Sequence, residues 1–120
     1  MTMVQIMDTV RDRSSRYAVS GEAVADAAAV RAFLAEVKAV KKFASATHNS
    51  WAAVLVDGSV LKDDDGEAGA AAVILRMIER AGLVGQIVVV TRWYGGVNLG
   101  GDRFAHVVTS VRAYLAARGN

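Results

Sequence analysis

The sequence predicts an α/β fold, also classed as α+β: a two-layer sandwich of about four strands and three helices. Two kinds of apolar pattern lead to this class. Some segments are apolar on both alternating faces, as in strands, and others repeat apolar residues every three or four positions, as in helices. The 120 residues include no repeat and no linker-like stretch, so we expect a single domain over residues 1–120.

The N-terminal part of the chain is predicted to contain two short strands and one long helix. Residues 3–7 and 16–19 carry short apolar runs typical of strands. Ser20 is a suitable N-cap, and beyond it apolar residues recur at helical spacing through an alanine-rich stretch. We therefore expect a helix from about Glu22 to Lys42.

The middle of the chain is predicted to form a hairpin and an interior strand. Residues 51–56 are apolar on both faces, and Asp57 and Gly58 follow as the expected positive-φ pair of a tight turn. Residues 59–62 would then return antiparallel to the first strand. Residues 86–91 read QIVVVT, which indicates a strand buried on both faces.

Two further helices are predicted in the second half of the chain. Apolar residues at helical spacing mark residues 74–81, and Gly82 is placed to end this helix in the left-handed conformation. Another apolar stripe runs over residues 104–115, with Asp102 as the expected N-cap. These helices and strands together give the predicted sandwich.

Composition excludes several kinds of site and compartment. The chain has no cysteine, which rules out disulfides, thiolate nucleophiles and iron–sulfur clusters. The uncharged, largely apolar stretch of residues 81–91 is about half as long as a membrane span. The first fifteen residues carry four charges and lack the apolar centre of a signal peptide. We expect a soluble cytoplasmic protein that does not bind a membrane.

Charge is unevenly distributed along the chain. The net charge is +2, yet five acidic residues and one lysine lie within residues 57–67. The remainder carries thirteen basic and seven acidic residues. A basic body with one acidic patch could meet phosphate at one place and a cation at another.

The first of three polar segments is KKFASATHNS, residues 41–50. Lys41 and Lys42 could contact phosphate, or they could be solvated at a helix end, where cations favour the negative end of the dipole. His48 and Asn49 precede the predicted hairpin. They are either binding residues or structural residues held by hydrogen bonds.

The second polar segment is DDDGE, residues 63–67, directly before a predicted helix. Asp64, Asp65 and Glu67 could stabilise the positive end of that helix. Alternatively they could hold Mg²⁺, with His48 as general base. The spacing does not match a calcium loop, and we assign neither a metal site nor a cofactor to the chain.

The third polar segment is RWYGGVNLGGDR, residues 92–103, which joins the interior strand to the last helix. Its glycines leave backbone N–H groups free for an anion, and its arginines and aromatic rings offer donors and stacking surfaces. The segment matches neither a Walker A loop nor G-x-G-x-x-G. The alternative is a tight turn with packed rings. The candidate binding residues are Arg92, Trp93, Tyr94, Gly95, Gly96, Gly100 and Arg103.

These segments carry a resemblance to a known family. The runs KKFASATHN, DDGEAGAA and VVVTRWYGGVNLGGDRFAH, together with DRSS at residues 12–15, resemble the IMPACT family, whose bacterial members include the YigZ proteins. The likeness extends over residues 12–115, and the LGGDRF run is similar to the eukaryotic branch. It implies an α/β fold like the second domain of a small-subunit ribosomal protein, and an association with translational control.

Three functions follow as hypotheses. The first is a regulator of translation that binds RNA or a ribosome-associated protein, without catalysis, through the lysines, His48, Asn49 and the glycine-rich turn. The second is a protein-interaction module in which Trp93 and Tyr94 anchor a partner. The third is a Mg²⁺-dependent enzyme acting on a phosphate compound through His48 and the acidic segment. The family resemblance supplies no reaction to carry over.

Overall fold

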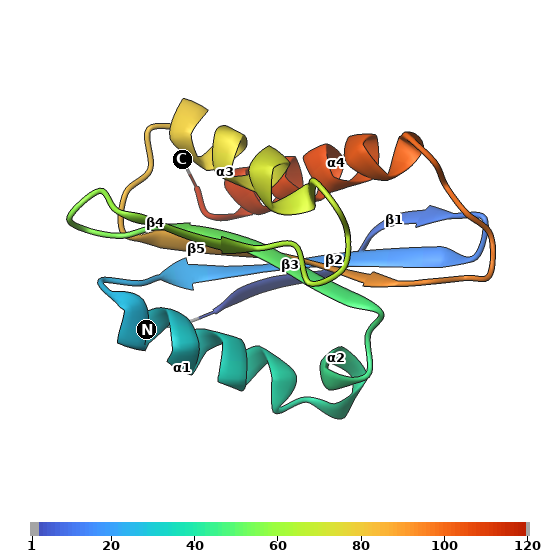
Figure 1. The fold of residues 1–120 in the computed structure, drawn as a ribbon, viewed down its shortest axis with the longest axis horizontal. Coiled ribbons are helices and arrows are strands. Elements are labelled where there is room, and N and C mark those ends of the chain that lie inside the picture. The colour runs from blue at the N-terminus through green and yellow to red at the C-terminus, as the bar shows by residue number, and fades with distance from the viewer. Residues whose placement is uncertain (1–2, 120) are drawn as a thin grey trace.

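A computed structural model describes residues 3–119 of the chain (Figure 1). Five antiparallel strands form one sheet in the order β1-β2-β5-β3-β4. The strands are β1 Val4–Asp12, β2 Ser15–Ala23, β3 His48–Val54, β4 Val60–Asp63 and β5 Gln86–Trp93. The helices are α1 Ala27–Lys38, α2 Lys41–Ala44, α3 Ala70–Arg80 and α4 Asp102–Ala117. Within these residues no helix is both long and apolar enough to cross a membrane.

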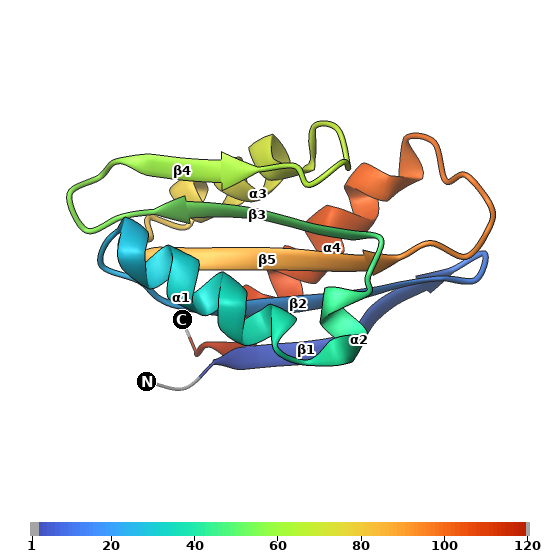
Figure 2. The same ribbon diagram turned by 60° about the horizontal axis from the view of Figure 1, so that its bottom comes forward.

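The predicted α/β sandwich is confirmed. Helices α3 and α4 form the layer packed most closely on the sheet, and α1 with α2 covers the opposite face (Figures 1 and 2). Strand β5 lies at the centre of the sheet, as predicted from its β-branched residues. Val88 and Val90 pack beneath α3 and α4, whereas Ile87 and Val89 pack toward α1. This alternation explains why the segment is apolar at every position.

The predicted helix from Glu22 to Lys42 is wrong at both ends. Strand β2 continues to Ala23, and Ser20 pairs with Val89 of β5 instead of capping a helix. The N-cap of α1 is Asp26, whose carboxylate accepts a hydrogen bond from the Ala29 N–H at 2.9 Å. Strand pairing therefore overrides the helical spacing in this segment.

The other elements match the sequence prediction with local differences. Strands β1 and β2 are longer than expected, and the return strand is β4 as predicted. In the hairpin turn only Gly58 has positive φ, while the Asp57 carboxylate accepts hydrogen bonds from Ser59. Gly82 ends α3 with a φ of 71°, as predicted. The N-cap of α4 is Gly101, so the prediction of Asp102 is wrong by one position.

Candidate functional site

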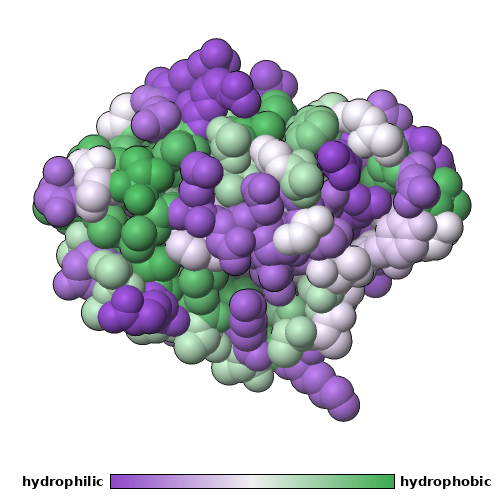
Figure 3. Space-filling model, viewed as in Figure 1, coloured by the Kyte–Doolittle hydropathy of each residue, from purple (hydrophilic) through white to green (hydrophobic). Residues whose placement is uncertain are grey.

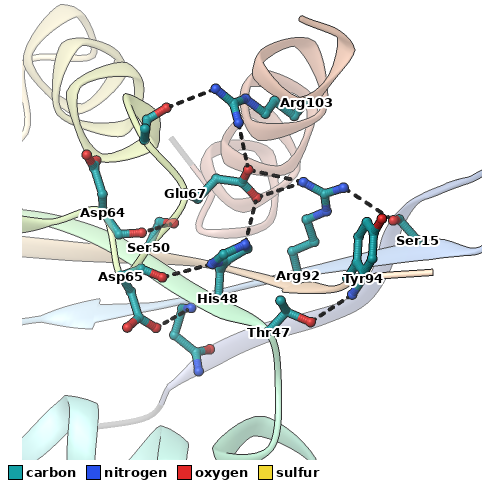
Figure 4. Close-up of polar contacts among 12 residues, drawn as sticks. Ser15, Thr47, His48, Ser50, Asp64, Asp65, Glu67, Arg92, Tyr94 and Arg103 are labelled. Carbon is teal, nitrogen blue, oxygen red and sulfur yellow. Dashed lines mark hydrogen bonds and ion pairs between the residues drawn. The ribbon is translucent and has the colours of Figure 1, made fainter. Parts of the chain in front are cut away.

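The topology brings all three polar segments to one end of the sheet (Figure 4). Strands β3 and β5 are antiparallel neighbours, so His48 at the start of β3 pairs with Arg92 near the end of β5. The loop that leads into α3 supplies Glu67, and the N-terminal end of α4 supplies Arg103. These residues line a pocket of about 420 Å³. The three segments therefore form one site.

A buried cluster of charges forms the floor of this pocket. The Glu67 side chain is 4% exposed, and its two carboxylate oxygens accept hydrogen bonds from Nη1 of Arg92 at 3.1 and 3.0 Å. Nη1 of Arg103 lies 3.5 Å from the same carboxylate. Two guanidinium groups thus face one carboxylate. The cluster keeps a net positive charge, and the Arg92 side chain, 7% exposed, is held rigidly by its partners.

His48 lies beside this cluster with a defined orientation. Its Nδ1 is 2.8 Å from the backbone oxygen of Asp65, and because a carbonyl only accepts hydrogen bonds, Nδ1 carries a proton. Its Nε2 faces the pocket, 3.9 Å from the Glu67 carboxylate. Glycine is favoured at position 66, because its φ is 87° and a Cβ there would lie 3.1 Å from the imidazole. The sequence prediction that His48 belongs to a site is consistent with this position.

Asn49 does not belong to the pocket. Its side chain is buried, donates a hydrogen bond to the Phe43 backbone oxygen and accepts one from the Thr91 hydroxyl. It joins β3, β5 and the one-turn helix α2. These contacts favour the structural alternative for Asn49 over the predicted binding role.

The carboxylates of the acidic segment have different partners. The Asp64 carboxylate accepts hydrogen bonds from the Ala71 and Gly69 N–H groups at 2.8 and 3.1 Å, and these bonds lower the pKa of Asp64. The Asp65 carboxylate accepts one from the Asn49 N–H. Only Glu67 turns toward the pocket, and among residues 3–119 no three metal-ligating side chains converge. Of these carboxylates only that of Glu67 lies near His48, so the arrangement does not support the predicted three-carboxylate Mg²⁺ site.

The glycines of the third segment have two different roles. Gly95 donates its N–H to the Ser15 hydroxyl, and a Cβ there would overlap the Ser14 backbone. Gly96 has a φ of 92° and does not line the pocket. Gly100 and Gly101 do line it, beside the start of α4, and their N–H groups donate no hydrogen bond within the described part of the chain. The predicted anion-binding role therefore fits Gly100, whereas Gly95 and Gly96 form the turn.

The two aromatic residues lie on opposite faces of the sheet. Trp93 packs edge-on against Phe43, and its indole N–H donates to the Lys42 backbone oxygen at 3.0 Å. Lys41 and Lys42 lie on α2 near this ring, away from the pocket. The two lysines were expected to bind phosphate together with the glycine-rich turn, but α2 lies on the face of the sheet opposite α3 and α4, so they do not line this pocket.

Tyr94 is the aromatic residue that lines the pocket. Its side chain is exposed, with 46% of the residue accessible to solvent. The Arg92 guanidinium lies 5.7 Å from the centre of its ring, and its hydroxyl donates to the Asn98 side chain at 3.2 Å. The Tyr94 ring lies at the rim of the pocket, and the buried Arg92 guanidinium lies over one face of it.

Two residues behind Arg92 were missed by the sequence analysis of the site. The Ser15 hydroxyl lies 3.5 Å from Nη2 of Arg92, and Tyr17 places its ring 5.7 Å below the guanidinium. Burial raises the pKa of Tyr17 to about 12, and its hydroxyl has no hydrogen-bond partner within residues 3–119. Ser15 belongs to the DRSS run, so the family likeness was the available signal for it.

The comparisons with known proteins agree with the sequence resemblance. A family model described as the Impact N-terminal domain matches residues 13–115. The chain belongs to this family. Its curated relatives include Protein IMPACT-B from Xenopus tropicalis, 35% identical over 99% of this chain, and Protein IMPACT from Homo sapiens, 35% identical over 91%. The chain spans 39% and 36% of the length of these two relatives.

Two solved structures share the fold. A crystal structure of a hypothetical protein superimposes with a TM-score of 0.80 at 24% identity, covering 96% of this chain and 57% of that one. The two-domain translational regulator Yih1 superimposes with a TM-score of 0.57 at 31% identity, covering 94% of this chain and 44% of that one. The Impact-type domain described here therefore corresponds to 57% of the first chain and 44% of the second.

Proposed function

We propose that this Impact-type domain binds single-stranded RNA through the pocket, as part of a noncatalytic regulator of translation. The observation that carries the proposal is the net positive charge of the pocket floor, where the guanidinium groups of Arg92 and Arg103 meet the single carboxylate of Glu67. The likeness to Yih1, a translational regulator, supports the setting of translation. The proposal also implies a cytoplasmic location.

The pocket offers separate places for a phosphate and a base. Two groups are suited to a phosphate oxygen: the N–H groups of Gly100 and Gly101, which donate no hydrogen bond among residues 3–119, and the Arg103 side chain, which is one-third exposed. The exposed ring of Tyr94 is suited to stack on a base. The volume of about 420 Å³ lies within the range of pockets that hold small ligands, about 300–1,000 Å³. One extended nucleotide would therefore fit, which favours single-stranded over duplex RNA.

The roles of the charged residues differ in this proposal. Arg92 is almost fully buried and donates from Nη1 to both carboxylate oxygens of Glu67, so it positions the cluster and contributes long-range positive charge. Arg103 is one-third exposed and can turn toward a phosphate. Glu67 holds both guanidinium groups in place and does not contact the ligand. His48 supplies Nε2 at the pocket wall, where it can accept a hydrogen bond from a ribose hydroxyl.

Fluorescence anisotropy with a labelled 12-nucleotide single-stranded RNA, at low and moderate salt, tests the proposal. Tyr94→Ala is expected to weaken binding about tenfold, in line with about 1–3 kcal/mol per stacked base, and Tyr94→Phe to retain binding. Arg103→Gln is expected to weaken binding and to lower the salt slope by about one. Arg31→Gln on α1 makes the same charge change on the opposite face and should leave affinity nearly unchanged.

Two outcomes would contradict the proposal. One is the absence of binding by the wild-type chain at low salt. The other is equal affinity of the Tyr94→Ala, Arg103→Gln and Arg31→Gln variants, because binding would then not depend on the pocket.

A further inference from the structure

A second concave surface lies between α3 and α4 and takes no part in the pocket function. It is a groove of about 650 Å³. Its floor is apolar and consists of Val73 and Met77 on α3 and Val108 and Leu115 on α4, all partly buried. Val73, Met77 and Leu115 also pack against the core beneath. The apolar floor is thus held in place by the core and remains open to solvent.

The rim of this groove is strongly basic. Arg76 and Arg80 on α3 and Arg112 on α4 line it and are exposed, and the groove contains no acidic lining residue. Within residues 3–119 none of these three side chains forms an ion pair or a side-chain hydrogen bond. Arg76 and Arg80 are one helical turn apart, so their charges repel. Figure 3 shows a hydrophilic cluster at the top of the molecule, above α3, beside hydrophobic surface.

We propose that this groove binds an acidic amphipathic helix of a partner protein. The apolar face of such a helix would cover the floor, and its flanking Asp or Glu side chains would pair with Arg76, Arg80 and Arg112. Charge complementarity selects this occupant, because the groove presents three guanidinium groups around apolar side chains, and none of the three has an ion-pair partner among residues 3–119. The unbranched thioether of Met77 can adapt to aliphatic anchors of different shape.

The dimensions of the groove set the length of the partner segment. Helix α3 has 11 residues and therefore extends about 16 Å, or about three helical turns. A matching helix presents apolar residues at positions i, i+3 or i+4, and i+7 toward the floor. Single-stranded RNA could place phosphates on the arginines but would leave the apolar floor without an apolar partner. A membrane surface is too flat to reach that floor.

Nuclear magnetic resonance with the ¹⁵N-labelled chain tests this proposal. The probe is a synthetic 18-residue helical peptide with leucine at i, i+3, i+4 and i+7 and glutamate on both flanks. We expect the amide signals of residues 73–81 and 104–115 to shift on titration, while those of α1 stay in place. The double variant Arg76→Glu/Arg112→Glu is expected to weaken binding at least tenfold, since exposed charges are reversed without change to the floor.

Matched controls separate this site from nonspecific attraction. Arg31→Glu/Lys38→Glu makes the same charge change on α1 and should bind the acidic peptide like the wild type. A peptide with lysine in place of glutamate should bind the Arg76→Glu/Arg112→Glu variant and not the wild type. The proposal is overturned if the acidic peptide shifts no signal of α3 and α4 at millimolar concentration, or if a scrambled peptide binds equally. It is also overturned if RNA or anionic vesicles displace the peptide from the groove.

Discussion

Replacing Glu67 by glutamine removes the one negative charge that holds two guanidinium groups at the pocket floor. The Glu67 side chain is 4% exposed and that of Arg92 is 7% exposed, so water cannot compensate for the lost charge. Removing one partner of a buried ion pair costs about 3–5 kcal/mol. Glutamine keeps one oxygen as an acceptor for Arg92, so we expect a loss near the lower limit, about 3 kcal/mol.

This loss is large enough to measure by thermal and chemical unfolding. For a chain of this size 1 kcal/mol corresponds to about 4 °C in Tm, so Glu67→Gln should lower Tm by about 12 °C. Urea unfolding followed by circular dichroism gives the free energy of unfolding independently. Glu79→Gln on α3 is the matched control, because Glu79 is exposed, and its effect should stay within about 0.5 kcal/mol. A loss below about 1 kcal/mol for Glu67→Gln would refute the claim that this carboxylate binds the two arginines together.

Three other substitutions test the packing and electrostatics around the site. Asp64→Asn should destabilise the chain by about 1 kcal/mol at pH 6, because it weakens the cap of α3. The folded-state pKa of Asp64 lies below its ordinary value of 3.8, so the stability difference from wild type should shrink as the pH falls below 3.8. An equal difference in urea unfolding at pH 6 and pH 3 would argue against the cap. Gly21→Ala would place a Cβ in the Tyr114 ring and should lower the free energy of unfolding by about 1–3 kcal/mol. In Gly101→Ala the new Cβ meets no atom within 4 Å, so the loss of stability should be much smaller. Equal Tm values for the two variants would contradict this expectation. Tyr17→Phe removes a buried hydroxyl that has no hydrogen-bond partner within residues 3–119, so the free energy of unfolding should stay level or rise by up to about 1 kcal/mol. The absorbance titration should also lose the tyrosine step near pH 12. A marked loss of stability would indicate that the hydroxyl forms a hydrogen bond in the folded chain.

The sequence predicted those elements whose apolar pattern is set by burial alone. Strand β5 is apolar at every position because both its faces are covered, and α3 and α4 each bury one continuous stripe. The helix expected from Glu22 failed for a tertiary reason. Gly21 lies against the Tyr114 ring, and β2 pairs with β5 as far as Ala23. Neither contact can be predicted from the local spacing of apolar residues.

The candidate site was located by its polar segments, but the roles of its residues were not predictable from them. Whether Arg92 or Trp93 faces the pocket depends on the register of β5 in the sheet. The ion pair of Glu67 and Arg92 joins a residue in the loop before α3 to a residue of β5, 25 positions further along the chain. Asp64 and Glu67 look alike in the sequence, yet one caps α3 and the other forms the charged floor. Only the three-dimensional arrangement separates these functions.

RNA binding in the pocket is the central proposal for this domain. Amide spectra of the ¹⁵N-labelled chain, titrated with single-stranded RNA, test this directly because they report each backbone N–H separately. We predict that the signals of Gly100 and Gly101 shift first and furthest, together with those of Tyr94 and Arg103, while the signals of α1 remain unchanged. Shifts confined to α1 and α2, with the glycine signals fixed, would contradict the account.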